Sequence, residues 1–343
     1  MPVKIKLDGA SRTPLYKQLI EQLEAGVRSG QMAPGEMLPS MNELSFRTGI
    51  SKETVKKAYA ILRDKGLVVP KQGKGFFISE EGRSSRPSVL LLFDRLSIYK
   101  QLLFNSFCEE IADRAELAIL THNQNLDLFE YYLDNHIDNH DFYIITPHFP
   151  LDGKSQARAL KLLGRVPNRK LILMDRWMKD LPGKYGAVYQ DFENDAYYGL
   201  MQGADKLRQC SRLVAVTLPA SLYGAQISKA IARAGEELGI PVVFTTGTPG
   251  EIRKGDTYLL LNSQLDWGVA DLAGRVAKTG LEIGRDVWVI SYNEMSLNEV
   301  VLGGLTTLST DFPQMGREAA RMILSRTPGK VHCDFRLIRR ATF

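Results

Sequence analysis

The sequence predicts an α/β protein in two parts: a small helical unit that ends in a β-hairpin, and a larger, two-lobed unit of doubly wound parallel sheets. Three observations support this fold class. The first 80 residues show helical periodicity followed by two short β runs. From residue 89 onward, short apolar runs alternate with helical stretches. The length of 343 residues exceeds what one compact core holds, so two or three units are expected.

Three helices are predicted first. Residues 14–30 place leucines and a valine on one stripe and end at Gly30, which is typical of an amphipathic helix. Ser40 opens a second helix and has Glu43 three residues later, the spacing of a capping box. Ser51 is a suitable N-cap for a third helix. The buried face of that third helix should consist of Val55, Ala58, Tyr59 and Leu62.

A hairpin and a linker complete the N-terminal part. Residues 67–70 and 76–79 are short β runs, separated by the basic, glycine-rich tip Lys71-Gln72-Gly73-Lys74-Gly75. Three helices followed by such a hairpin form a winged helix-turn-helix, which we assign to residues 1–79. Residues 80–88 are polar and contain Gly, Ser and Pro, so we expect a linker.

The remainder, residues 89–343, is predicted to form two lobes, because its eight apolar runs exceed one typical lobe. Most runs are continuous rather than alternating, as strands buried on both faces must be. Ligands of such sheets bind at the carboxyl ends of the strands. The predicted strands are 89–93, 117–121, 142–146, 171–174, 213–217, 242–245, 258–261 and 287–291. Helices are expected at roughly 99–115, 127–139, 154–164, 194–208, 223–238 and 266–279.

The charge distribution points to a polyanion partner for the N-terminal unit. Residues 1–80 hold 13 Lys and Arg against 8 Asp and Glu, whereas residues 81–343 hold 31 of each. Phosphate contacts supply most non-specific DNA affinity. The first turns of the third helix would reach base edges, and the hairpin tip would follow a phosphate track or the minor groove. The alternative is a solvated helix face. The residues concerned are Ser51, Lys52, Glu53, Thr54, Lys56, Lys57, Lys71, Gln72, Gly73 and Lys74.

The stretch from Pro14 to Ser79 resembles the GntR family of bacterial repressors. The resemblance rests on the ordered motifs P-L-Y-x-Q-L, G-x-x-L-P-S, S-K-E-T-V-K-K-A, L-R-D-K-G-L-V and G-K-G-F-F-I. That family often has Arg where Asn42 and Lys52 stand, and Lys grips guanine less rigidly, so the operator sequence is expected to differ from common family sites. The resemblance implies DNA contacts at Ser40, Asn42, Lys52, Thr54, Lys56, Gln72, Gly73 and Lys74.

Residues 88–343 resemble the periplasmic-binding-protein-like effector domain of the LacI family. The matching segments include K-L-I-L-M-D-R (170–176), V-W-V-I-S-Y-N-E (287–294) and L-T-T-L-S-T-D-F-P-Q-M-G-R-E-A-A (305–320). The resemblance implies a small-molecule sensor, with a sugar as effector and with contacts at Asp175, Asn262 and Asn293. A ligand-binding Arg of that family is missing, since Gln226 or Ser228 stands at its place. The effector therefore need not be the usual aldohexose or pentose.

The strand ends carry the side chains that a sugar cleft requires. Carboxylates, amides and Arg bind pairs of hydroxyls, and aromatic rings cover apolar sugar faces. The alternatives are that Asp175 and Arg176 form a purely structural ion pair, and that the tryptophans only pack. Arg95 and Gln264 are further strand-end candidates. We predict ligand contacts at Asp94, Tyr99, His148, Asp175, Arg176, Trp177, Asp191, Asn262, Trp267 and Asn293.

Several function classes are not supported by the sequence. Cys108, Cys210 and Cys333 are far apart and odd in number, which suits free thiols in a reducing cytoplasm. We expect no signal peptide and no membrane span, and a cytoplasmic location. His136 and His140 lack an acidic partner in the right place between them, so we expect no metal. We find no Gly-rich phosphate loop and no G-x-S-x-G motif, and therefore expect no cofactor, no catalytic residues and no enzyme activity.

The prediction is a DNA-binding transcription regulator, by default a repressor of a carbohydrate-utilisation operon, that binds a palindromic operator as a homodimer. Its effector would be a mono- or disaccharide or a sugar phosphate. One alternative is the same kind of regulator sensing a non-sugar metabolite. An alternative of another class is a solute-binding protein without a DNA role, which residues 14–79 argue against.

Overall fold

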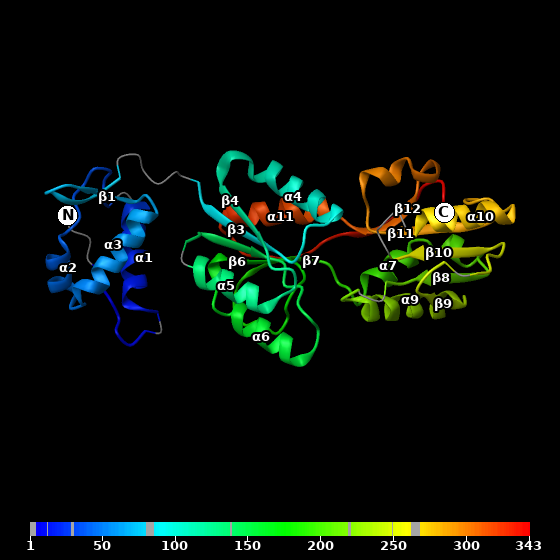
Figure 1. The fold of residues 1–343 in the computed structure, drawn as a ribbon, viewed down its shortest axis with the longest axis horizontal. Helices are drawn as coiled ribbons and strands as arrows, with labels where there is room; N and C mark the ends of the chain where they lie inside the picture. The colour runs from blue at the N-terminus through cyan, green and yellow to red at the C-terminus, as the bar shows by residue number, and fades with distance from the viewer. Residues whose placement is uncertain are drawn as a thin grey trace. The chain divides into compact units, whose positions relative to one another are not determined.

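The computed structural model describes residues 5–11, 13–28, 31–79, 86–137, 139–218, 221–248, 250–261 and 268–343. The chain divides into two compact units, Met1–Pro87 and Ser88–Phe343, hereafter the N-terminal and C-terminal units (Figure 1). Most of the residues predicted as a linker, 80–85, lie outside the described part. Cys108, Cys210 and Cys333 are free, as expected.

The N-terminal unit has the elements of the predicted winged helix-turn-helix. Both predicted helix caps are confirmed: the Ser40 hydroxyl accepts a hydrogen bond from the Glu43 amide at 3.1 Å, and Ser51 accepts one from the Thr54 amide at 3.2 Å. The elements are α1 (Leu15–Arg28), α2 (Met41–Thr48), α3 (Lys52–Asp64) and the antiparallel strands β1 (Val68–Lys71) and β2 (Gly75–Ile78).

Helix α3 is anchored on both sides. Its predicted inner face, Val55, Ala58, Tyr59 and Leu62, is 0–1% exposed. The Tyr59 hydroxyl donates to the Pro39 carbonyl just before α2, at 2.7 Å, and its ring packs edge-on against Phe76 of the wing, 5.1 Å between centroids. One side chain thus fixes α3 to the turn before α2 and to the hairpin.

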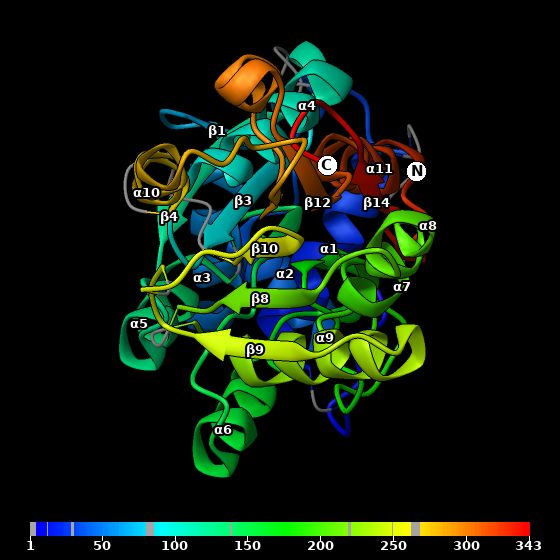
Figure 2. The ribbon, with the colours of Figure 1, turned by 90° about the vertical axis from the view of Figure 1, so that its right-hand side faces the viewer.

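The C-terminal unit contains two six-stranded sheets, one in each lobe (Figure 1, Figure 2). The first lobe has the strand order β13-β7-β6-β5-β3-β4, all parallel. Its strands are β3 (Ser88–Phe93), β4 (Glu116–Thr121), β5 (Phe142–Ile145), β6 (Leu171–Asp175), β7 (Gly186–Tyr189) and β13 (Lys330–His332). Its helices are α4 (Ile98–Ile111), α5 (Leu126–His136), α6 (Gly153–Leu163) and α11 (Phe312–Ser325).

The second lobe repeats this order, β14-β12-β11-β10-β8-β9, with only β14 antiparallel. A doubly wound α/β fold is therefore confirmed. The strands are β8 (Arg212–Val216), β9 (Val242–Thr245), β10 (Asp256–Leu260), β11 (Trp288–Tyr292), β12 (Thr306–Thr310) and β14 (Phe335–Ile338). The helices are α7 (Asp195–Met201), α8 (Ala204–Leu207), α9 (Gly224–Leu238) and α10 (Val269–Thr279).

All eight predicted strands are present. The sequence did not predict four further strands, β7, β12, β13 and β14, or the helix α11. The sequence of β12, Thr-Thr-Leu-Ser-Thr, is mostly polar although all five residues are buried. The strands β7, β13 and β14 have only three or four residues each. The single helix predicted over 194–208 is two helices, α7 and α8, and the helix expected to reach residue 115 ends at Ile111, because Ala112 adopts φ 48°.

The chain passes between the lobes three times. It leaves β7 through residues 190–194, a segment we call the first crossover, and enters α7 of the second lobe. It returns from β12 to α11 at Asp311, and passes back from β13 to β14 at residues 333–334. Helix α11 packs closely on α4: a Cβ at Gly316 would lie 2.2 Å from the Leu103 carbonyl oxygen.

Candidate functional site

The predicted DNA-contacting residues of the helices lie at the surface of the N-terminal unit. Ser40 and Ser51 cap α2 and α3, and Asn42, Lys52 and Lys56 are exposed. The Ser51 and Thr54 hydroxyls contact each other at 2.8 Å. Within the described ranges, Lys56 has only the exposed Glu53, at 3.7 Å, as an ion-pair partner. The first turn of α3 therefore presents cations and hydroxyls to solvent.

The wing tip is exposed as well. Lys71, Gln72, Gly73 and Lys74 are all at the surface, and the Lys71 ammonium lies 4.8 Å from the centre of the Phe77 ring. Gly73 has φ +72°, a conformation that L side chains rarely adopt, although no atom lies within 4 Å of a Cβ built there. The glycine is thus required for the turn and not for lack of room.

In the C-terminal unit, both lobes contribute to a cavity of about 560 Å³. It lies between the residues after β6, the first crossover and the start of α9. Of the predicted ligand contacts, Arg176, Trp177 and Asp191 line it. The other lining residues are Gln156, Leu160, Met178, Lys179, Asp180, Tyr189, Gln190, Phe192, Glu193, Tyr223, Gln226 and His332.

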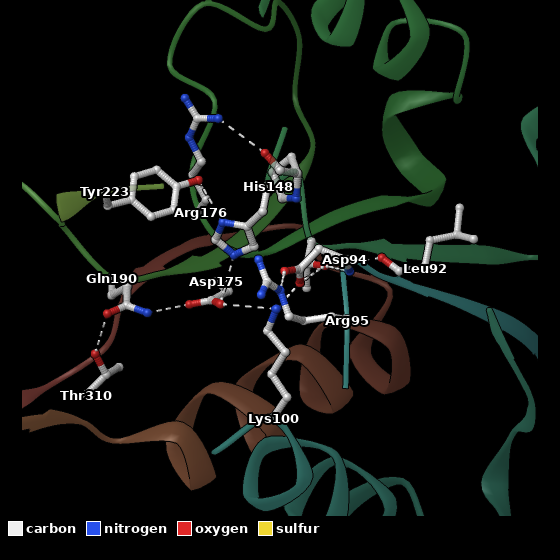
Figure 3. A network of polar contacts seen from close by, with 12 residues as sticks. Leu92, Asp94, Arg95, Lys100, His148, Asp175, Arg176, Gln190, Tyr223 and Thr310 are labelled. Carbon is white, nitrogen blue, oxygen red and sulfur yellow. Dashed lines mark hydrogen bonds and ion pairs between the residues drawn. The ribbon is translucent and has the colours of Figure 1, made fainter. Parts of the chain in front are cut away.

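A buried polar network centred on Asp175 adjoins the cavity wall (Figure 3). His148 Nε2 donates to Asp175 Oδ2 at 2.9 Å, and the Tyr223 hydroxyl bonds His148 Nδ1 at 2.7 Å. The Gln190 amide donates to Asp175 Oδ1, and its own oxygen accepts from Thr310 Oγ1 at 2.9 Å. The network ends at Tyr223 and Thr310, which belong to the second lobe. Asp175 and His148, by contrast, belong to the first lobe.

The network includes a buried lysine. Lys100, 1% exposed, contacts the carboxylate of Asp94 and lies 4.0 Å from that of Asp175. Burial lowers the pKa of Lys100 to about 8, although Asp175 opposes this shift. Burial alone would raise the pKa of Asp175, but its contacts with His148, Lys100 and Gln190 outweigh burial and hold it at about 2. The Asp175 carboxylate and the Lys100 ammonium are therefore charged at neutral pH.

His148 and Tyr223 are neutral partners in this network. Burial lowers the pKa of His148 and raises that of Tyr223. The order Tyr223–His148–Asp175 resembles the nucleophile, base and orienting acid of a hydrolytic triad. The raised pKa of the phenol and the lowered pKa of the imidazole keep the proton on Tyr223. The arrangement is suited to orienting side chains.

The cavity wall itself combines one guanidinium with aromatic rings. Arg176 donates to the Pro147 carbonyl at 3.2 Å and to Gln156 Oε1 at 2.9 Å, and does not bond its neighbour Asp175. The Phe192 and Tyr223 rings stack at 3.8 Å and 11°. Such a wall offers apolar faces and a few fixed polar groups, as small-molecule sites do.

The remaining predicted ligand contacts are dispersed. Asp191 uses both carboxylate oxygens within its own turn, for the Glu193 amide and Asn194. Tyr99 packs on Phe312 at 4.8 Å. Trp177 lines the cavity but also donates to the Tyr185 hydroxyl at 3.1 Å. Asp94 is bound to Lys100 inside the network. Asn262, Gln264 and Trp267 lie outside the described residues.

Asn293 occupies the place in the second lobe that Asp175 occupies in the first. Each stands at the carboxyl end of the third strand in its sheet order, β11 for Asn293 and β6 for Asp175, and each has positive φ, 70° for Asn293 and 72° for Asp175. The Oδ1 atom of Asn293 is buried and has no hydrogen-bond partner among the described residues. A buried acceptor of this kind is available to a ligand or a water.

Sequence reasoning missed Lys100, Gln190, Phe192 and Tyr223. Gln190 and Phe192 flank the predicted contact Asp191 after β7, a strand too short to be predicted, and nothing in the sequence singled them out. Tyr223 immediately precedes α9 and could have been found by extending that rule to the helix that follows β8. Lys100 lies on a helix face between apolar residues, and nothing in the sequence distinguishes it from an exposed lysine.

Two classes of site are not seen in the described part of the chain. Among those residues no group of three or more His, Cys, Asp or Glu is placed to hold a metal ion. Searched over the same ranges, no helix is long and apolar enough to cross a bilayer.

The fold and the cavity define a winged helix-turn-helix protein with a two-lobed, periplasmic-binding-protein-like domain. Residues 15–78 match the family model of bacterial regulatory proteins of the gntR family. Residues 213–342 match the model of a periplasmic binding protein-like domain. The chain thus joins an N-terminal region of the gntR type to a periplasmic-binding-protein-like domain, as the sequence predicted.

Individual relatives agree with each half. The HTH-type transcriptional repressor YtrA of Bacillus subtilis is 37% identical over 81 residues, which are 24% of this chain and 62% of YtrA. The chain therefore spans less than two thirds of that relative, and only 31% of the repressor NagR from the same organism.

Solved structures resemble the C-terminal unit. A LacI family transcriptional regulator from Arthrobacter sp. FB24, in complex with lactose, has a TM-score of 0.54 at 21% identity and covers 75% of this chain and 99% of its own. The trehalose repressor from Escherichia coli has a TM-score of 0.57 at 14% identity and covers 74% of this chain and 100% of its own. At these identities the likeness establishes the fold.

Proposed function

We propose that the chain is a transcription regulator that binds operator DNA through its N-terminal unit and a small-molecule effector in the cavity of its C-terminal unit. It acts as a homodimer on a palindromic operator, in the cytoplasm, and has no enzyme activity. The observation that carries the proposal is the cavity. Both lobes supply its walls, and the wall residue Gln190 begins a crossover. A molecule bound there contacts both lobes and can change how they are held together.

The DNA-binding half is tested by removing two cations from α3. Lys52→Ala with Lys56→Ala should weaken operator binding and lower the salt slope by about 2, roughly 0.9 for each phosphate that is no longer neutralised. The matched control removes the same charge from α6, where Lys154 and Lys161 are equally exposed. Unchanged operator affinity in the α3 variant, or an equal loss in the control, rejects the recognition-helix assignment.

The effector is proposed to be a sugar or sugar phosphate. Support comes from the stacked Phe192 and Tyr223 rings and from Arg176, whose guanidinium is bound only to neutral acceptors among the described residues. The lactose-bound relative also supports it. Neutral mono- and disaccharides and sugar phosphates are screened by thermal unfolding and by operator release. A ligand at a hundred times its Kd adds about 2.7 kcal/mol of stability.

A non-sugar effector is the second candidate. It is favoured by the engagement of both Asp175 oxygens within the chain, and by Gln226 or Ser228 at the position where the resemblance implies an Arg. If no carbohydrate changes the unfolding temperature or operator binding while a metabolite of another class does, the sugar assignment is wrong and the regulator assignment remains.

A further inference from the structure

Three members of the buried network, Lys100, Asp175 and His148, lie behind the cavity wall. Lys100 and Asp175 are each 1% exposed and His148 is 5% exposed, and none of the three is among the residues that line the cavity. The network nevertheless reaches the cavity wall at two residues, Tyr223 and Gln190 (Figure 3). Its members are therefore placed to act on the cavity through others.

The charge on Asp175 sets the direction of the contact between lobes. A carboxylate only accepts, so His148 must carry its proton on Nε2, which faces Asp175 at 2.9 Å. The Nδ1 of the neutral imidazole is then an acceptor, and the Tyr223 hydroxyl at 2.7 Å donates to it. The bond from the second lobe to the first is thus oriented by a carboxylate whose own charge Lys100 compensates.

The same carboxylate orients a joint between two crossovers. Asp175 accepts from the Gln190 amide nitrogen, which turns the Gln190 oxygen toward the Thr310 hydroxyl at 2.9 Å. Gln190 begins the first crossover, and Thr310 is the last residue of β12 before the second. One buried group therefore governs a contact across the cavity and a contact between the segments that join the lobes.

We propose that Lys100, Asp175 and His148 are positioning residues that hold Tyr223 against the first lobe and keep the two lobes together at the cavity before an effector binds. This inference deepens the proposed function, because it assigns a resting arrangement to the effector site. It concerns the chain without ligand and is tested there. An effector that displaces Tyr223 or Gln190 acts on the joint between the lobes directly.

The first test deletes one hydroxyl from the full-length, ligand-free protein. Tyr223→Phe keeps the ring that stacks on Phe192 and removes only the donor to His148. Tyr292→Phe is the matched control, because the Tyr292 hydroxyl is buried in the same unit and has no hydrogen-bond partner in the described part of the chain. Amide hydrogen exchange is followed in peptides that cover residues 190–194 and 224–228.

Removing the bond between lobes should speed exchange in both segments about fivefold in the Tyr223 variant, the factor for one hydrogen bond of ordinary net strength. The control should exchange like the unaltered protein. Equal rates in Tyr223→Phe and the unaltered protein would overturn the proposal, as would the same acceleration in the Tyr292 control.

The second test asks whether Asp175 acts through His148. Asp175→Asn keeps the side-chain shape and removes the charge, and nitrogen NMR of the imidazoles reports the tautomer, with His148 assigned by its replacement with Gln. We expect the Nε2–H tautomer to lose its preference. The double variant with Tyr223→Phe should exchange no more than about twofold faster than Asp175→Asn alone. An unchanged tautomer or additive effects would reject the positioning role.

Operator binding of the unaltered chain is measured in parallel. Failure to bind any operator would reject the proposed regulator and leave the exchange and NMR results standing. A failed exchange test in a chain that binds its operator would reject the positioning residues alone.

Discussion

Replacing Lys100 by Met removes the buried cation that contacts Asp94 and Asp175 inside the first lobe, and leaves the guanidinium of the exposed Arg95, 3.6 Å from Asp94, as a cation near them. The Lys100 side chain is 1% exposed, and those of Asp94 and Asp175 are 5% and 2% exposed. Met fills a similar volume, so the change is chiefly one of charge. The variant can relieve the repulsion by protonating one carboxyl, and with an ordinary pKa of about 3.9 this costs about 4 kcal/mol at pH 7. Breaking buried ion pairs costs about 3–5 kcal/mol, which agrees.

The assay is urea unfolding of the full chain, followed by tryptophan fluorescence. All three tryptophans, Trp177, Trp267 and Trp288, lie in the C-terminal unit, so the signal reports on that unit alone. The loss of stability in Lys100→Met should depend on pH. Protonating the carboxyl costs only about 1.5 kcal/mol at pH 5, so the stability deficit should shrink on acidification. A surface control, Lys161→Met on α6, should lie within about 0.5 kcal/mol of the unaltered chain.

Two results would refute this reasoning. One is a deficit below about 1 kcal/mol at pH 7, which would mean that Lys100 does not compensate the carboxylates. The other is a deficit of the same size at pH 5 and pH 7, which would trace the loss to packing. Adding Asp94→Asn to Lys100→Met should restore part of the stability, because one of the two buried charges is then removed.

Three further predictions use other features. Asp175 has a pKa of about 2 in the folded protein, below its unfolded value of 3.8. Its contribution to the free energy of unfolding is therefore complete above pH 3.8 and is lost as the pH falls through 2. Acid unfolding of Asp175→Asn should lack this contribution of about 2 kcal/mol. Gly316→Ala should destabilise the C-terminal unit by about 2 kcal/mol or more, because the added Cβ would meet the Leu103 carbonyl. Gly274→Ala in α10 has open space around the added Cβ and should stabilise the unit by about 0.5–1 kcal/mol. Thermal unfolding of the two variants measures both effects. Ser51→Ala removes the N-cap of α3 and should cost the N-terminal unit about 1 kcal/mol, measured by circular dichroism, with operator affinity falling in step.

The sequence was most informative where a pattern is local. The caps at Ser40 and Ser51, the inner face of α3 and the eight apolar strands each follow from neighbouring residues, and all were found. The polar strand β12 could not be recognised, because its threonines and serine are buried only through tertiary contacts.

The cavity shows the same division. Arg176 and Trp177 follow a recognisable strand and were predicted, and both line the cavity. Tyr223 and Gln190 meet the first lobe only through the fold. The role of Asp175 also depends on its surroundings: the sequence marks it as a strand-end carboxylate, but only the structure reveals that His148, Lys100 and Gln190 occupy its oxygens. The predicted DNA and ligand contacts stay predictions, which the binding experiments above test.

The three passages between the lobes have a consequence for how the protein is made. The first lobe is built from residues 88–189 together with α11 and β13, so its last strand ends at His332. During synthesis, α4 must wait for about 200 further residues before α11 arrives to cover it, and the second lobe emerges from the ribosome in between. The N-terminal unit, whose elements end at Ile78, can fold as soon as it emerges. A nascent chain therefore has a folded DNA-binding unit long before the first lobe is complete.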